Sequence, residues 1–311
     1  MMRARLAAVL ALSFGLLARA GGPQDPARPV FRADVSRVSL NAVVRDERGR
    51  PVTGLTLADF QVLDEGEAVA ISDFRAGPGP VSVALLVDTS GSMRLADRLT
   101  LAKQAVQLLA DALVPGDEAA LFTFDLNLHD LAPFSSDLAA LRAGADRILP
   151  FGSTALHDAV AATARRSVER PTGRRAVVVI TDGIDTSSEL SAAMASSIAS
   201  SIDVPVYILG VDGPAPPLVG GESGKVSDLE IMGRLDYLAR WSGGAFLPAA
   251  TRTTTQVAVD QILSDLRAGY LVAFAPRETP GWHRITVKVS RRGSAVQARG
   301  GFWVGPRLTS R

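Results

Sequence analysis

Almost continuously apolar runs alternate with amphipathic segments in the middle of the chain, from Val81 to Leu266. Such runs are typical of parallel strands that are buried on both faces of a sheet. They cover residues 81–87, 119–124, 176–180 and 204–209, with a return at 128–134 that we expect at a sheet edge. Between them, apolar residues recur every three or four positions, as on one face of a helix. The alternation predicts a doubly wound, mostly parallel α/β sheet covered by helices on both faces.

The two ends of the chain show a period of two instead, which indicates half-buried strands. The pattern covers residues 38–44, 60–63, 69–71, 270–274, 285–289 and 302–304. We expect residues 60–63 to pair with 69–71 around the turn at Glu65-Gly66. Each end has too few strands to be stable alone. Residues 31–76 and 269–305 are therefore expected to form one small β-sandwich into which residues 80–268 are inserted; two independent β appendages are the alternative.

The first twenty residues have the pattern of a signal peptide. Arg3 and Arg5 precede an apolar run over residues 6–17, and Ala18-Arg19-Ala20 offers small residues at the cleavage-determining positions. A helix of that run reaches about 18 Å, short of a bilayer core of about 30 Å. We expect cleavage after residue 20, a linker over 21–30 and an exported protein, periplasmic or secreted, without a membrane span. An uncleaved anchor is the alternative.

Composition excludes several classes of function. The chain has no cysteine, so it can hold no disulfide, thiolate zinc site or cysteine nucleophile. Its net charge is +1, and its arginine pairs, Arg165-Arg166, Arg174-Arg175 and Arg291-Arg292, indicate solvated surface rather than a nucleic-acid track. The histidines at 129, 157 and 283 lie in three separate segments, which does not favour a zinc or catalytic triad.

Three separate segments carry oxygen-bearing side chains where strands are expected to end. They are Asp88-Thr89-Ser90-Gly91-Ser92, Gly152-Ser153-Thr154 and Thr181-Asp182-Gly183. In open α/β sheets, ligands bind outside the carboxyl ends of the strands. Asp and Ser are also ordinary residues at helix starts, so Asp88 and Ser90 alone would fit a cap. The convergence of all three segments on one edge instead favours a ligand site.

The donor types at this edge suit a hard cation such as Mg²⁺ or Mn²⁺, which takes oxygen ligands. Ser90, Ser92 and Thr154 would supply neutral hydroxyl oxygens. Asp88 and Asp182 would hold the assembly, largely through water and hydrogen bonds. Mostly neutral direct ligands leave such an ion under-neutralised, so it would attract an anionic oxygen from outside, such as a Glu or Asp of a partner.

These three segments resemble the metal-ion-dependent adhesion site of von Willebrand factor A domains, and none of the five metal positions departs from the family pattern. The resemblance covers Val81 to Leu266. The flanks resemble a bacterial subfamily of exported A-domain proteins, over residues 40–74, with Gly54-Leu55 and Asp59-Phe60, and over 270–304. The family implies a Rossmann-like fold, a divalent ion, usually Mg²⁺, and ligand binding rather than catalysis.

We therefore expect an exported, metal-dependent binding or adhesion module, not an enzyme, that captures an acidic group of a protein partner. One rival is a scaffold that the metal only stabilises. The other is a metal-dependent hydrolase, for which no general base is evident. Residues 212–227 are rich in Pro and Gly, and we expect a long loop there at the same edge, either a specificity element or a surface insertion. Asp185 follows the third motif and could support the metal ligands from behind, but we interpret it as a solvated turn acid. His157 is interpreted as an exposed residue of a first helical turn.

Overall fold

The computed structural model describes residues 37–170, 173–201, 203–211 and 228–304. The predicted signal peptide, the linker and the loop 212–227 lie outside the described residues. The described strands form three sheets, one of six strands and two of four. Among the helices described, none combines the length and apolarity that crossing a membrane requires.

The six-stranded sheet is the predicted doubly wound sheet, with strand order β10-β9-β8-β5-β6-β7. Its strands are β5 (Ser82–Asp88), β6 (Glu118–Phe124), β7 (Leu128–Ser135), β8 (Arg175–Thr181), β9 (Val206–Gly210) and β10 (Phe246–Pro248). All neighbours pair in parallel except β7, which returns antiparallel along β6 at one edge, as expected. The parallel strands therefore end at a common edge, where connecting loops can bring distant residues together.

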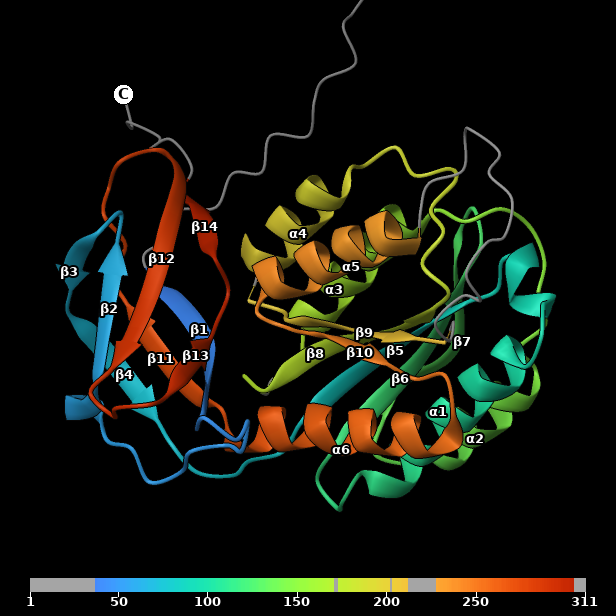
Figure 1. The fold of residues 1–311 in the computed structure, drawn as a ribbon, viewed down its shortest axis with the longest axis horizontal. Coiled ribbons are helices and arrows are strands. Elements are labelled where there is room, and N and C mark those ends of the chain that lie inside the picture. The colour runs from blue at the N-terminus through green and yellow to red at the C-terminus, as the bar shows by residue number, and fades with distance from the viewer. Residues whose placement is uncertain (1–36, 171–172, 202, 212–227, 305–311) are drawn as a thin grey trace, which may run out of the picture. The chain divides into compact units, whose positions relative to one another are not determined.

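Six helices cover the two faces of this sheet (Figure 1). They are α1 (Arg98–Ala112), α2 (Ala139–Asp146), α3 (Leu156–Val168), α4 (Ala192–Ser201), α5 (Asp228–Ser242) and α6 (Arg252–Ala268). Leu85 and its odd-numbered neighbours in β5 pack with α1, α2 and α6 in one apolar core. Ala84 and Leu86 face the other side and pack with α3, α4 and α5. Continuous apolarity of the strand thus follows from burial on both faces.

The remaining strands form a sandwich to which both ends of the chain contribute. One sheet has the order β13-β1-β11-β4 and the other β14-β12-β2-β3. The strands are β1 (Val38–Arg45), β2 (Phe60–Asp64), β3 (Glu67–Val69), β4 (Ile71–Arg75), β11 (Tyr270–Phe274), β12 (Gly281–Val289), β13 (Ala295–Gln297) and β14 (Gly301–Val304). Their inner faces share one apolar core, which includes Leu40, Val62, Tyr270 and Phe302. The expected joint packing of the two flanks is confirmed.

One detail of the predicted pairing is wrong. Val69 pairs with Val62 in the sheet of β2 and β3, whereas Ile71 pairs with Phe274 in the other sheet. Ala70 lies outside both strands, so the chain changes sheets at this residue. A period-two pattern continues through such a crossing, because both segments still bury alternate side chains in the same core.

Buried arginines join the sandwich to the α/β part. The expectation of a solvated Arg174 is wrong, because its guanidinium is buried at this junction. Arg174 donates hydrogen bonds to the carbonyl oxygens of Leu266 and Gly269, at 2.8 and 2.7 Å, where α6 leads into β11. Arg299 donates to the carbonyl oxygens of Ser200 in α4 and Ser39 in β1. Removing one of these guanidinium groups would leave buried carbonyls without donors, which costs about 1–3 kcal/mol each.

Candidate metal centre

Each of the five predicted metal residues lies at the carboxyl edge of the central sheet or in a loop beside it. Asp88 is the last residue of β5, and Ser90 and Ser92 follow in the short 3-10 turn η2 (Gly91–Arg94) and its cap. Thr154 lies two residues before α3, and Asp182 directly follows β8. Because β5 is hydrogen-bonded to β8, the two carboxylates come from neighbouring strand ends.

Asp88 is completely buried and held by two donors. Its Oδ1 accepts the backbone N–H of Ser90 at 2.8 Å, and its Oδ2 accepts the hydroxyl of Thr181 at 2.6 Å. Burial raises the pKa of Asp88 to about 6, although the bonds from Thr181 and Ser90 act in the opposite direction. A nearby cation would favour the ionised carboxylate, because opposite charge offsets the cost of burial. The environment of Asp88 therefore suits a cation-binding edge.

The hydroxyl oxygens of Ser90 and Ser92 lie 3.0 Å apart. Adjacent oxygens around an octahedral Mg²⁺, each at its usual ligand distance, are about 2.9 Å apart. Ser90 is buried and Ser92 is partly exposed, so this oxygen pair lies at the boundary with solvent. The spacing of the two hydroxyls fits two neighbouring ligands of one small cation.

Backbone hydrogen bonds bring the loop of Thr154 to the loop of the two serines. Gly91 N–H donates to the carbonyl of Gly152 at 3.0 Å, and Phe151 N–H donates to that of Thr89 at 2.5 Å. Gly152 has φ +95°, and a Cβ there would lie 3.1 Å from Cβ of Asp125. Glycine is thus required for this approach. Thr154 is buried beside it; among the hydrogen bonds of described residues, none joins its hydroxyl to either serine.

Asp182 has a charged partner that sequence reasoning missed. Arg98, the first residue of α1, forms an ion pair with it, with Nη1 2.8 Å from Oδ2. The same guanidinium donates to the carbonyl oxygen of Ser92 at 3.2 Å. Arg98 therefore neutralises much of the charge of Asp182 and ties it to the serine loop. An ion held here would gain less negative charge from the protein than two free carboxylates would supply.

Over the described residues, no three side chains among Asp, Glu, His and Cys gather as a metal site. Any cation held at this edge would therefore depend on hydroxyl ligands. Ser90, Ser92 and Thr154 are the residues that could supply them, with Asp88 and Asp182 behind them. That donor set matches the preference of hard divalent ions for oxygen.

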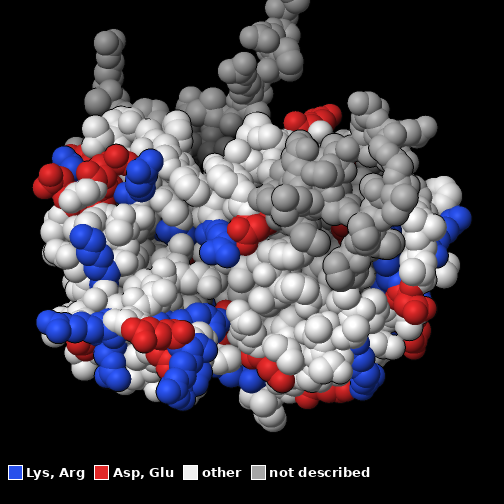
Figure 2. Space-filling view, viewed as in Figure 1, with Lys and Arg blue, Asp and Glu red and all other residues white. Residues whose placement is uncertain are grey.

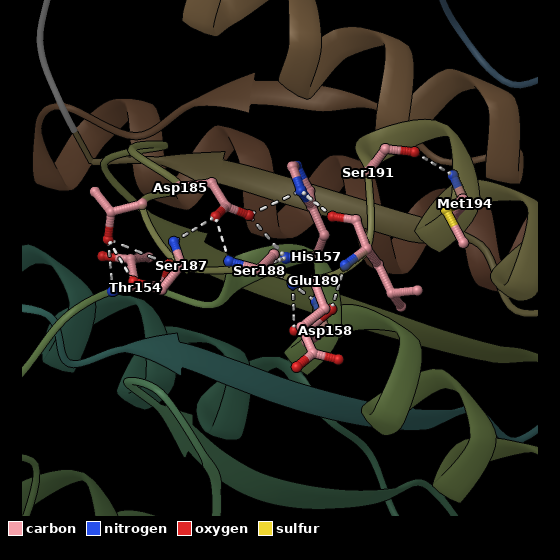
Figure 3. A network of polar contacts seen from close by, with 11 residues as sticks. Thr154, His157, Asp158, Asp185, Ser187, Ser188, Glu189, Ser191 and Met194 are labelled. Atoms are coloured by element: carbon pink, nitrogen blue, oxygen red, sulfur yellow. Dashed lines mark hydrogen bonds and ion pairs between the residues drawn. The ribbon is translucent and has the colours of Figure 1, made fainter. Parts of the chain in front are cut away.

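A network of polar contacts holds the backbone around Thr154 (Figure 3). The carbonyl oxygen of Thr154 accepts the N–H groups of Thr186 and Ser187, both at 3.0 Å. Its own N–H donates to the hydroxyl of Thr186 at 3.1 Å. The loop after β8 therefore fixes the backbone of Thr154. In this way it connects the motif that contains Asp182 to the motif that contains Thr154.

The same loop is anchored by His157 and Asp185, whose Nδ1 and Oδ2 atoms lie 2.8 Å apart (Figure 3). Asp185 also accepts the backbone N–H groups of Ser187 and Ser188, at 3.1 and 3.0 Å. Both side chains of the pair are mostly buried. The sequence interpretation of an exposed histidine and a solvated turn acid is therefore wrong. It failed because the pairing depends on how α3 and the loop after β8 meet in space.

Large exposed apolar side chains surround this edge. They are Leu95, Leu126, Leu149, Phe151 and Ile184, which we call the apolar rim. Each lies in a loop at the carboxyl end of the sheet or beside one of the three motifs. Leu149 and Phe151 are 74 % and 72 % exposed. Exposed apolar side chains gathered on one part of a surface are typical of protein interaction sites.

Comparisons with known proteins agree with this architecture. The family described as von Willebrand factor type A domain matches residues 83–184. A UPF0353 protein of Mycolicibacterium paratuberculosis is 34 % identical over 118 residues, which are 36 % of this chain and 35 % of that protein. The chain thus spans about a third of the length of this curated relative.

Solved structures of similar fold come from several bacteria. The conserved hypothetical protein BatB from Bacteroides thetaiotaomicron is similar with a TM-score of 0.50 and 26 % identity, over 60 % of this chain and 98 % of that one. A von Willebrand factor type A structure from Catenulispora acidiphila has a TM-score of 0.48 at 13 % identity, over 91 % of this chain and 79 % of that one.

Proposed function

Because this chain carries a von Willebrand factor type A domain, we propose that it is an exported binding module that captures a protein partner through a divalent cation. Ser90, Ser92 and Thr154 would hold the ion, Mg²⁺ or Mn²⁺, with Asp88 and Asp182 as supporting carboxylates. The ion supplies a Lewis-acidic position for an oxygen ligand. The partner would offer a Glu or Asp carboxylate, since the direct ligands are neutral.

The observation that carries this proposal is the joining of three distant segments at one sheet edge. The serine loop is bonded to Gly152, Asp182 to Arg98, and Thr154 to Thr186 and Ser187. Contacts within the protein thus fix three separate loops. A site fixed in this way loses little conformational entropy on binding.

The apolar rim supports a protein as the ligand. A small anion would contact only the polar candidate metal centre. The apolar rim around that centre offers additional area that a protein could contact. Phe151 is an aromatic side chain next to the centre, the kind of residue that dominates binding energy at interfaces. The proposed partner therefore presents a carboxylate with apolar neighbours.

The test is a pull-down from the envelope fraction of the parent cell with wild-type and Thr154→Ala protein, each with Mg²⁺ and with chelator. We expect capture of a partner by wild type in Mg²⁺ and its loss in the other three conditions. If Mg²⁺ raises the melting temperature of wild type but no chelator-sensitive partner is captured, the ion is structural and the proposed capture is refuted.

A further inference from the structure

A hollow of about 610 Å³ opens on the sandwich, away from the motifs of the metal edge. It is lined by residues 46–48 and 50–53, which follow β1, and by residues 291–294 between β12 and β13. Four arginines surround it: Arg48, Arg50, Arg291 and Arg292. With Asp46 and Glu47, they leave the hollow with a net charge of +2. Figure 2 shows Lys and Arg side chains gathered over this part of the molecule, at the lower left.

Hydrogen bonds fix the first turn. Oδ1 of Asp46 accepts the N–H groups of Arg48 and Arg50, both at 2.9 Å. Asp46 N–H donates to the carbonyl oxygen of Arg50 at 2.9 Å, and Gly49 N–H to that of Asp46 at 2.8 Å. The backbone that carries Arg48 and Arg50 is therefore ordered by its own sequence, as expected for an Asp-initiated turn.

The second turn is held against the first. Strands β1 and β13 pair, with Arg45 opposite Ala295, so both turns leave the same end of one sheet. The carboxylate of Glu47 lies over Gly293, where a Cβ would come within 2.5 Å of its Oε1. The hydroxyl of Ser290 donates a hydrogen bond to the carboxylate of Asp59 at 2.7 Å, which anchors the start of the second turn. The arginines of two distant segments are thus brought together by the fold.

Among the described residues, only one arginine of the hollow forms a close ion pair, and Arg291 also interacts at longer range with the carboxylate of Asp59. Asp46 is engaged by Arg50, at 2.8 Å from its Nη2. For Arg48, Arg291 and Arg292, no carboxylate of the described residues lies within ion-pair distance. Guanidinium groups present several N–H donors in a plane, which suits the bidentate contacts that phosphate oxygens accept.

We infer that this arginine hollow binds a phosphate group, carried either by a soluble phosphomonoester or by a lipid headgroup. A phosphomonoester is close to doubly negative at neutral pH, which matches the net charge of the hollow. Its several acceptor oxygens can engage arginines from both turns at once, as one carboxylate could not. The sequence indicated only solvated arginines at 291 and 292, because it could not reveal Arg48 and Arg50 beside them.

The test is a calorimetric titration of the full chain with inorganic phosphate at low ionic strength. R291A/R292A removes two charges from the hollow. R277A/R284A removes two charges from exposed arginines of the same sandwich, before and within the first half of β12. We expect phosphate binding to wild type, at least about tenfold weaker binding to R291A/R292A, and less than about twofold change in R277A/R284A.

Equal weakening in both double variants would overturn the proposal, because the effect would then come from net charge alone. Absence of binding to wild type would also overturn it. Melting temperatures equal to wild type exclude misfolding as the cause of a loss. Sedimentation with phosphatidylcholine vesicles, with and without phosphatidic acid, then identifies the source of the phosphate. Arg291-dependent sedimentation only with phosphatidic acid assigns a lipid headgroup, and binding of soluble phosphate alone assigns a phosphomonoester.

Discussion

Thr181, the last residue of β8, donates a 2.6 Å hydrogen bond from its hydroxyl to Oδ2 of Asp88, the last residue of β5. Both residues are completely buried. The bond crosses between two neighbouring strands and joins the first motif of the candidate site to the third. It also holds the carboxylate next to the two serine hydroxyls, which lie in the loop that follows it.

Thr181→Val removes this donor while keeping the shape of the side chain. We expect the free energy of unfolding to fall by about 1–3 kcal/mol, because a buried carboxylate loses a hydrogen bond. Thr163→Val is the matched control, since the hydroxyl of Thr163 is buried and has no hydrogen-bond partner among the residues that the structure describes. Urea unfolding of both variants measures the difference. An equal loss in the two would show that the Thr181 bond adds nothing to stability.

Phe151→Ser should weaken capture of the protein partner by about tenfold or more and leave Mg²⁺ affinity unchanged. An aromatic side chain that becomes buried in an interface, next to its centre, contributes on this scale. Val257→Ser, at an apolar position on α6 that is also exposed, is the control and should have no effect on capture. Pull-down with quantified yield and calorimetry with Mg²⁺ measure the two properties. Unchanged capture by the Phe151 variant would exclude the apolar rim from the interface.

Asp185→Asn should destabilise the protein in a pH-dependent way. Burial raises the pKa of Asp185, but the hydrogen bonds from His157 and Ser188 and the charge of His157 together bring it well below its usual value of 3.8. A lowered pKa in the folded state means that the carboxylate stabilises the protein at pH values above 3.8 and loses this contribution as pH falls through the lowered pKa.

The loss caused by Asp185→Asn is therefore expected to be about 1–3 kcal/mol at pH 7 and to shrink steadily below pH about 4. Urea unfolding of wild type and variant across this range measures it. If the difference in free energy of unfolding between wild type and variant is constant with pH, or grows as pH falls, the ionised form of Asp185 does not stabilise the loop.

Arg299→Met should uncouple the sandwich from the α/β part. The buried guanidinium donates to Ser200 and Ser39 and lies 3.8 Å from a carboxylate oxygen of Asp203. Its loss leaves a buried acid without its cation, which costs about 3–5 kcal/mol.

Trp241 and Trp282 stack at 5.9 Å across this junction, so tryptophan fluorescence reports on it. We expect the unfolding transition of Arg299→Met, followed by tryptophan fluorescence, to have a lower midpoint than that of wild type. The midpoint of Arg284→Met should equal that of wild type. An unchanged midpoint would contradict the role of Arg299.

The fold was predictable where burial alone determines the pattern. Leu85 and Leu86 face opposite helix layers, and this two-sided burial is what makes the strand continuously apolar. The sheet switch between Val69 and Ile71 was not predictable, because both residues enter the same core. A period of two reports which side chains are buried and not which strand they pair with.

The site was predictable only in part. The oxygen donors could be chosen because residue type and position at a strand end are visible in the sequence. The partners that hold them, such as Arg98 on Asp182 and Thr186 on Thr154, come from other elements and meet them only in three dimensions. Sequence spacing carries no information on such contacts, so the charge balance of the edge could not be derived before the structure.

The most direct measurement is calorimetric titration of wild type, Ser90→Ala and Asp97→Asn with Mg²⁺ and Mn²⁺. Asp97 is an exposed acid in the same loop region and serves as the control. We predict one ion bound per chain by wild type and by Asp97→Asn, and at least about tenfold weaker binding by Ser90→Ala. No heat of binding in wild type, or equal affinity in all three proteins, would contradict a cation held by these hydroxyls.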